Sequence, residues 1–186
     1  LSVNLDNLQV EDLFKADRIS ISPSLLGLLT GKIVLSSVAL VNPVITLEQS
    51  RQGKLNIPAV GQGGNPPAVY ITRLIVRDGK LIFIDKKADP SGFKIILNKV
   101  NIDIAKIMFP PTSLKATFKA TADLLKAAES KIGEVSFFGW VDFGPKDADA
   151  TISLKDLDAA YFYPYYGNFI SERKITSAKL DFQSRL

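Results

Sequence analysis

The amino-acid sequence predicts a mainly β protein, built as an antiparallel sheet from repeated strand-turn-strand units. Two segments, 38–48 and 74–84, align without a gap at a spacing of 36 residues. In both, apolar residues alternate on either side of a turn dipeptide, Asn42-Pro43 in the first and Asp78-Gly79 in the second. Side chains two residues apart share one face of a strand, so we interpret each segment as two strands joined at a tight corner. Antiparallel pairing is expected because parallel strands need crossovers of a dozen or more residues, which are mostly missing from the pattern.

The other elements follow from local patterns along the chain. Alternation predicts strands near residues 1–5 and 18–21, and Ser22-Pro23 before an apolar run that Gly31 closes predicts a short helix near residues 24–29. Further strands are expected at 33–40, 44–47, 93–97, 100–104, 114–121, 135–143, 152–154 and 178–182. The alternation changes parity near Asn98, which indicates a turn or a bulge. Residues 122–130 fit either a short helix or a strand end followed by a turn, and we favour the second.

The composition predicts one ordered domain without a membrane span of its own. The chain has 186 residues, of which 46% are hydrophobic and 23% charged, and no apolar run approaches 18 residues. Its net charge of +4 comes from 23 basic residues scattered among 19 acidic ones, so nucleic-acid binding is not expected. Because strand-like alternation starts at Leu1 without an initiator methionine, we expect the chain to be part of a longer protein.

Catalytic chemistry has little support in the sequence. There is no cysteine and no histidine, which removes thiolate chemistry, disulfides, and the commonest general base and transition-metal ligand. The glycine-rich segment 61–67 runs into prolines instead of a helix N-terminus, so a linker is a better interpretation than a phosphate-binding loop. Asp85, Asp89 and Asp103 have no spacing typical of a calcium or hydrolase site. We expect a protein that is not an enzyme and that holds no metal or cofactor.

One-sided alternation marks the candidate binding residues. In the segment 114–121, apolar residues at even positions alternate with lysine and threonine at odd positions, so the apolar side must contact something apolar. Similar alternation follows in 135–143 and 152–154. The candidate residues are Leu114, Ala116, Phe118, Val135, Phe137, Val141, Ile152 and Leu154.

An aromatic run at residues 161–167 allows two interpretations. It is either a strand end whose rings cover the edge of the core, or a surface that docks on a lipid interface or a partner, since tyrosine joins an apolar ring to a polar hydroxyl. We favour the first interpretation.

Several short motifs occur in order along the chain: Ile21-Ser22-Pro23-Ser24-Leu25-Leu26, the alternating residues of 38–47 around Asn42-Pro43, Gly53-x-Leu55-Asn56-Ile57, and the alternating residues of 71–85. Together these segments resemble the N-terminal module of the AsmA-like proteins of bacterial envelopes, which are related to bridge-like lipid transfer proteins. Near the C-terminus, 161–166 followed by 175–180 is similar to a Pro-Tyr pair before a strand, although Ser177-Ala178 stands where Ser-Gly is more usual.

The resemblance implies an elongated, curved β-sheet of the repeating-groove kind in the bacterial periplasm. It implies an anchor in the inner membrane through a helix that precedes Leu1, envelope proteins as partners, and a role in phospholipid transport or outer-membrane homeostasis. The candidate residues would then face phospholipid acyl chains along an apolar groove. The alternative is a structural, protein-interaction β-domain in which the same residues form a closed core, because a groove wall and a closed core have the same alternation.

Overall fold

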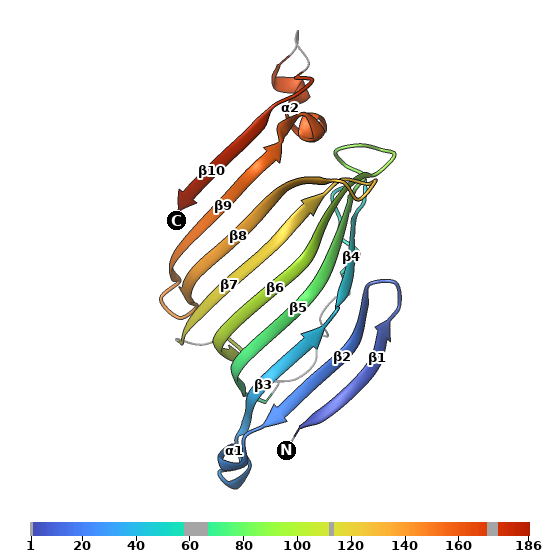
Figure 1. The fold of residues 1–186 in the computed structure, drawn as a ribbon. Helices are drawn as coiled ribbons and strands as arrows, with labels where there is room; N and C mark the ends of the chain where they lie inside the picture. Colours follow the sequence, from blue (N-terminus) through green and yellow to red (C-terminus); the bar gives the residue numbers. More distant parts are fainter. Residues whose placement is uncertain (1, 58–66, 112–113, 171–174) are drawn as a thin grey trace.

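Ten strands form one continuous sheet in the part of the chain that the computed structural model describes, residues 2–57, 67–111, 114–170 and 175–186 (Figure 1). The strands are β1 (Val3–Val10), β2 (Phe14–Pro23), β3 (Ile33–Val41), β4 (Val44–Gln49), β5 (Val69–Asp85), β6 (Phe93–Phe109), β7 (Lys115–Leu125), β8 (Lys131–Asp142), β9 (Asp147–Asp158) and β10 (Lys179–Arg185). The helical segments are α1 (Leu25–Leu29), η1 (Ala159–Phe162), α2 (Tyr163–Tyr166) and η2 (Gly167–Phe169). Strands make up 65% of the described residues and helical segments 9%, which confirms the mainly β prediction.

The strand order explains the 36-residue repeat. The order is β1-β2-β3-β5-β6-β7-β8-β9-β10, and β4 continues beyond β3 along the same side of β5. Most pairs are antiparallel, but β3 and β4 pair with β5 in parallel, with Val38 beside Leu74 and Ile45 beside Leu81. The repeat spacing is therefore the register of two neighbouring parallel segments. Antiparallel pairing predominates as predicted, and the exception is β5, because the chain between Gln49 and Val69 is long enough for the connection that a parallel pair needs.

The expected corners are bulges instead of hairpin turns. Asp78 has a φ of 52° and lies inside β5, which continues through it, while Asn42 has a φ of 49° and separates β3 from β4. The amide of Asn42 donates to the Arg77 carbonyl over 2.9 Å, and that of Lys80 donates to the Pro43 carbonyl over 2.7 Å, so the two bulges lie side by side. Asparagine and aspartate tolerate a positive φ better than most residues, and a bulge bends and twists its strand. Figure 1 shows the long strands bending along their length.

Other local expectations agree with the structure. The predicted short helix is α1, and the parity change near Asn98 is a bulge at Lys99, whose φ is 49°. Residues 122–130 are the end of β7 and a turn, closed by a hydrogen bond from the Lys126 amide to the Ser130 carbonyl. The predicted linker over residues 61–67 lies, except for Pro67, outside the described residues.

Candidate functional site

One face of the sheet is apolar from β1 to β9. Residues paired across neighbouring strands point to the same face, so the register defines rows of side chains that run across the sheet. One row consists of Leu5, Ile19, Leu40, Val76, Ile102, Ala120, Phe137 and Ile152. The next row consists of Val3, Ile21, Val38, Leu74, Ile104, Phe118, Gly139 and Ala150. We call this side the apolar face and treat it as the candidate functional site.

The bulges keep the face apolar along the strands. On the side of the bulges nearer α1, even-numbered residues such as Val76 of β5 and Ile102 of β6 point to the apolar face. On the other side of the bulges the odd-numbered Leu81 and Leu97 do so; they pair with each other, and Leu97 pairs with Leu124 of β7. One extra residue in a strand moves all following side chains to the opposite face. Because the bulge and the parity change of the sequence occur at the same place, the apolar residues stay on one face, and this face continues past the bend.

The structure places all eight predicted residues on this face. Ala116 pairs with Val141, Val135 pairs with Leu154, and Phe137 pairs with Ile152. The rings of Phe118 and Phe137 pack with their centroids 4.6 Å apart. Leu114 precedes β7 and lines a hollow at its start.

Sequence reasoning did not include the apolar residues of β2, β3, β5 and β6 among the site residues. Val38, Leu40, Leu74, Val76 and Ile102 show the same alternation as the predicted residues. Their membership of the site depends on which strands are neighbours and in what register, and the parity changes at the bulges conceal the common face. The alternation is the signal that could have found them, but only together with the strand order.

The apolar face is largely open to solvent. The chain exposes 12331 Å², whereas a compact monomer of 20.3 kDa exposes about 8,800 Å². Phe137, in the middle of the face, is 36% exposed, and Phe118, Val141 and Ile152 are half-buried. A closed core would leave such side chains almost fully buried. The structure therefore presents a single layer whose apolar side is available to a ligand.

A hollow of about 200 Å³ lies on the apolar face near the start of β7. Apolar residues dominate its lining, among them Ile104, Leu114, Phe118, Val141 and Phe143. Enclosed ligand pockets usually measure about 300–1,000 Å³. The hollow is therefore better described as one segment of an open groove than as a complete pocket.

The aromatic run closes the other end of the apolar face. Its residues form η1 and α2 instead of the expected strand end, and Phe93 at the start of β6 packs against Tyr161 and Tyr165 with centroids 4.8 and 5.3 Å apart. Tyr161 donates to the Lys94 carbonyl, and Tyr165 donates to Oδ2 of Asp85 over 2.9 Å. The rings thus cover the sheet end while their hydroxyls bond to the sheet, which agrees with the first of the two interpretations.

Asp85 is a buried carboxylate that fastens this aromatic cover. Its side chain is 5% exposed, and it accepts hydrogen bonds from the amides of Lys87 and Ala88 and from Tyr165. Burial acts to raise the pKa of Asp85, but these hydrogen bonds and the nearby Lys87 outweigh it, so the pKa is lowered overall. Burial and the bond to Asp85 raise the pKa of Tyr165. At neutral pH, the Asp85 carboxyl group is therefore ionised and the Tyr165 hydroxyl is protonated.

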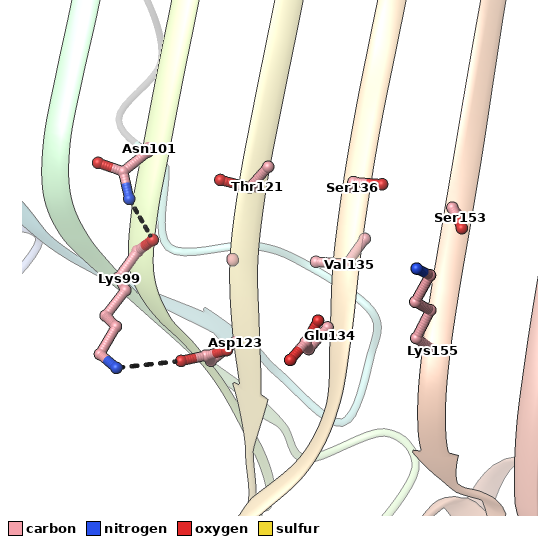
Figure 2. A pocket seen from close by; sticks show the side chains of 10 residues that line it. Lys99, Asn101, Thr121, Asp123, Glu134, Val135, Ser136, Ser153 and Lys155 are labelled. Carbon is pink, nitrogen blue, oxygen red and sulfur yellow. Dashed lines mark hydrogen bonds and ion pairs between the residues drawn. The ribbon is translucent and has the colours of Figure 1, made fainter.

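The opposite face of the sheet is polar and carries ion pairs between neighbouring strands. A hollow of about 430 Å³ lies on this side. Figure 2 shows that Lys99, Thr121, Ser136 and Ser153 of its lining come from four successive strands. Arg18 of β2 pairs with Asp6 of β1 over 2.8 Å. Arg185 of β10 pairs with Asp149 of β9 over 2.6 Å.

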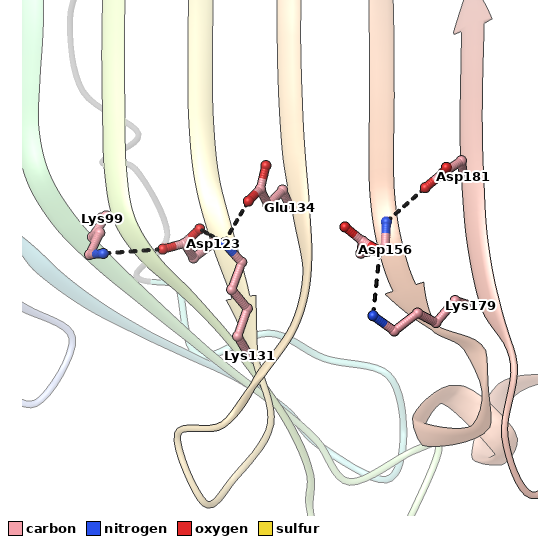
Figure 3. Close-up of polar contacts among 7 residues, drawn as sticks. All are labelled: Lys99, Asp123, Lys131, Glu134, Asp156, Lys179 and Asp181. Atoms are coloured by element: carbon pink, nitrogen blue, oxygen red, sulfur yellow. Dashed lines mark hydrogen bonds and ion pairs between the residues drawn. The ribbon is translucent and has the colours of Figure 1, made fainter.

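The charges around the polar hollow are largely matched. Lys131 contacts both Asp123 and Glu134, over 2.8 and 2.6 Å, and Lys99 lies 3.5 Å from Asp123 (Figure 3). The hydrogen bonds to Asp123 and Glu134 raise the pKa of Lys131 to about 12, and the Lys131 hydrogen bond lowers the pKa of Asp123. Because the groups neutralise one another and remain accessible to water, we interpret this side as a solvated face.

Two features are absent from the described residues. No cluster of three histidine, cysteine, aspartate or glutamate side chains there is arranged to hold a metal ion. None of the helices described is both long enough and apolar enough to cross a bilayer.

Comparisons with models of protein families, with curated proteins and with solved structures find no match to this chain. The resemblance to the AsmA-like family therefore stays a prediction, supported by the motifs quoted above.

Proposed function

We propose that this chain is a non-enzymatic phospholipid-binding module that holds acyl chains against its apolar face and leaves the head groups in water. The observation that carries the proposal is the pair of apolar rows that cross β1 to β9 with their central side chains still exposed. Exposed apolar areas of this extent are unusual for a monomeric domain and mark a binding surface. A module of this kind would serve lipid transport or outer-membrane homeostasis in the bacterial periplasm, as the resemblance implies.

The dimensions and the chemistry of the face suit acyl chains. The 12 residues of β8 extend over about 40 Å, whereas one leaflet of a bilayer has a hydrocarbon thickness of about 15 Å. Each methylene removed from water contributes about 0.8 kcal/mol. A partly covered chain is therefore held without specific polar contacts, and weak selectivity among phospholipids is expected.

The test uses substitutions on the two faces of one strand. Phe118→Asp places a charge in the apolar face, and Thr117→Asp adds the same charge to the adjacent exposed position on the polar face. Lipid that copurifies with each protein is measured by native mass spectrometry and by extraction. We expect the parent and Thr117→Asp to carry phospholipid, and Phe118→Asp to remain folded and carry at least tenfold less.

Two outcomes would count against the proposal. A folded Phe118→Asp protein with as much lipid as the parent removes this strand from the site. An unfolded Phe118→Asp protein favours the structural domain, because a partner or a second copy must then cover the apolar face and bury the unpaired carboxylate at a cost of several kcal/mol.

A further inference from the structure

The helix α1, which precedes β3, carries three highly exposed leucines. Leu25, Leu26 and Leu29 are 66%, 76% and 84% exposed, and the five-residue helix contains no charged residue. Figure 1 shows α1 projecting beyond the ends of β2 and β3, at the opposite end of the sheet from α2. Leucine side chains in such a position contribute nothing to the core, so a stabilising role within the chain does not explain them.

The exposure of these leucines results from the way α1 is attached to the sheet. The Ser24 amide donates to the Val34 carbonyl over 2.8 Å, and the Lys32 amide donates to the Gly27 carbonyl over 3.0 Å. A Cβ at Gly27 would lie 2.6 Å from the Cβ of Val34, so the helix meets β3 through its glycine. The close approach at Gly27 holds α1 in place while Leu25, Leu26 and Leu29 remain exposed.

Other exposed apolar side chains lie at the same end of the sheet. Ile33, Val69 and Phe109 are paired across β3, β5 and β6, and Ile33 and Phe109 are 44% and 52% exposed. Phe143, at the end of β8, is 53% exposed and lines the apolar hollow. By their register, Val69 and Phe109 lie on the side of the sheet opposite to Leu74 and the apolar face, whereas Phe143 borders the hollow. Exposed apolar side chains thus occur on both sides of this end of the sheet, and the aromatic cluster covers the opposite end of the apolar face.

The charges at this end are favourable for an anionic surface. Residues 18–47, 67–77 and 104–122 contain no aspartate or glutamate, but they contain Lys32, Lys106 and Lys115 near the strand ends. Lys32 adjoins α1, whereas Lys115 pairs in register with Asp142 at the end of β8 and its Nζ lies over the Trp140 ring. Leucines beside Lys32, in a stretch without carboxylates, match the apolar and anionic layers of a membrane interface.

We propose that α1 and the adjoining strand ends dock on a phospholipid bilayer, with Leu25, Leu26 and Leu29 inserted among the head groups and upper acyl chains. Lipid then enters the apolar face from this end and is stopped by the aromatic cluster at the other. Lipid entry from this end rests on the proposed function, whereas docking of α1 on the bilayer does not. The helix is far too short to span the bilayer and lies within the interface.

Docking is tested by sedimentation of the full chain with vesicles of phosphatidylcholine alone or mixed with phosphatidylglycerol. We expect binding that is stronger to the anionic mixture, and a loss of at least tenfold for the double variant Leu26→Asp/Leu29→Asp. Phe169→Asp is the matched control, because Phe169 is 86% exposed at the α2 end. If the aspartate variant fails to fold, Leu26→Ser/Leu29→Ser replaces it.

Insertion itself has a direct spectroscopic readout. Trp140 is the single tryptophan, so Leu29→Trp in a Trp140→Phe background places one fluorophore on α1. Its emission is expected to shift to the blue with vesicles and to be quenched by lipids brominated on their acyl chains. The absence of quenching would place α1 outside the bilayer and overturn the proposal.

Monomeric short-chain phosphatidylcholine separates docking from lipid binding, because it reaches the apolar face without a vesicle. The α1 variants are expected to bind it like the parent, and Phe118→Asp is expected to lose it. A parent that binds monomers but no vesicles overturns docking and leaves the proposed function intact. Docking is also overturned if the α1 variants bind vesicles like the parent, or if the parent binds no vesicles but forms dimers that these variants abolish.

Discussion

At the scale of single residues, Gly79 shows how a position predicted as a turn works inside a strand. Its φ does not lie in the left-handed region, which Asp78 occupies instead. Gly79 is buried, and a Cβ there would lie 3.1 Å from Val76, 3.2 Å from Pro43 and 3.3 Å from Val100. The glycine is therefore needed for the close contact between the bulges of neighbouring strands.

We expect Gly79→Val to destabilise the protein by about 1–3 kcal/mol, because its extra atoms enter a crowded contact. Gly79→Ala adds only the Cβ, so its cost should be smaller. Chemical denaturation measures both, and Gly31→Asn is the control, since Gly31 has a positive φ and nothing within 4 Å of the added Cβ. An unchanged midpoint for Gly79→Val would show that the bulges do not need this contact.

Asp85 makes stability depend on pH. Because its folded-state pKa is depressed below the ordinary value of 3.8, it contributes stability above that pH, and the contribution is lost as the pH falls through the folded-state pKa. We expect Asp85→Asn to be less stable than the parent at pH 7 and the difference to narrow below about pH 4. Melting temperatures from pH 7 to pH 3 test this, with Asp147→Asn as the exposed comparison. A difference that stays constant over this range would contradict the role of the ionised carboxylate.

At the scale of elements, each long strand separates an apolar side from a polar side. In β6, Ile102 belongs to an apolar row, whereas Asn101 pairs with Thr121 on the opposite face. Strands of this kind usually bury their apolar side against a second layer. Here the described elements form one layer, so the apolar side of every strand contributes to the candidate site.

The continuity of the rows predicts that β6 belongs to the lipid site as β7 does. Ile102→Asp should reduce copurifying phospholipid by about as much as Phe118→Asp, because both charges enter the same apolar face. Asn101→Asp is the matched control one residue away. Its carboxylate can still accept the hydrogen bond from the Asp78 amide, but the donation from the Asn101 amide to the Lys99 carbonyl over 2.8 Å is lost, so circular dichroism must show that this variant is folded. Full lipid retention by a folded Ile102→Asp protein would restrict the site to β7, β8 and β9.

At the scale of the whole molecule, the single layer predicts an extended shape in solution. A compact domain of 186 residues has a radius of gyration of about 16 Å, whereas a plate with this strand length and spacing gives about 20 Å. Small-angle scattering of the lipid-free monomer should yield the larger value. An apolar dye such as ANS should bind the native protein and be displaced by phospholipid. A radius near 16 Å without dye binding would indicate that the apolar face closes on itself.

The sequence by itself determined where most strands lie, the short helix α1 and the polarity of their sides, because alternation is local and depends on the pleat alone. Candidates such as Phe118 and Phe137 were recognisable for that reason. Only the tertiary structure decided that β5 runs unbroken through Asp78 and pairs in parallel with β3, and that Leu40 and Phe137 lie in one row. Register and strand order depend on contacts between distant residues, and a bulge such as that at Lys99 changes the parity on which sequence reasoning relies. Whether an apolar side is covered is likewise a property of the assembled sheet, so the open face and the exposed leucines of α1 appear only in three dimensions.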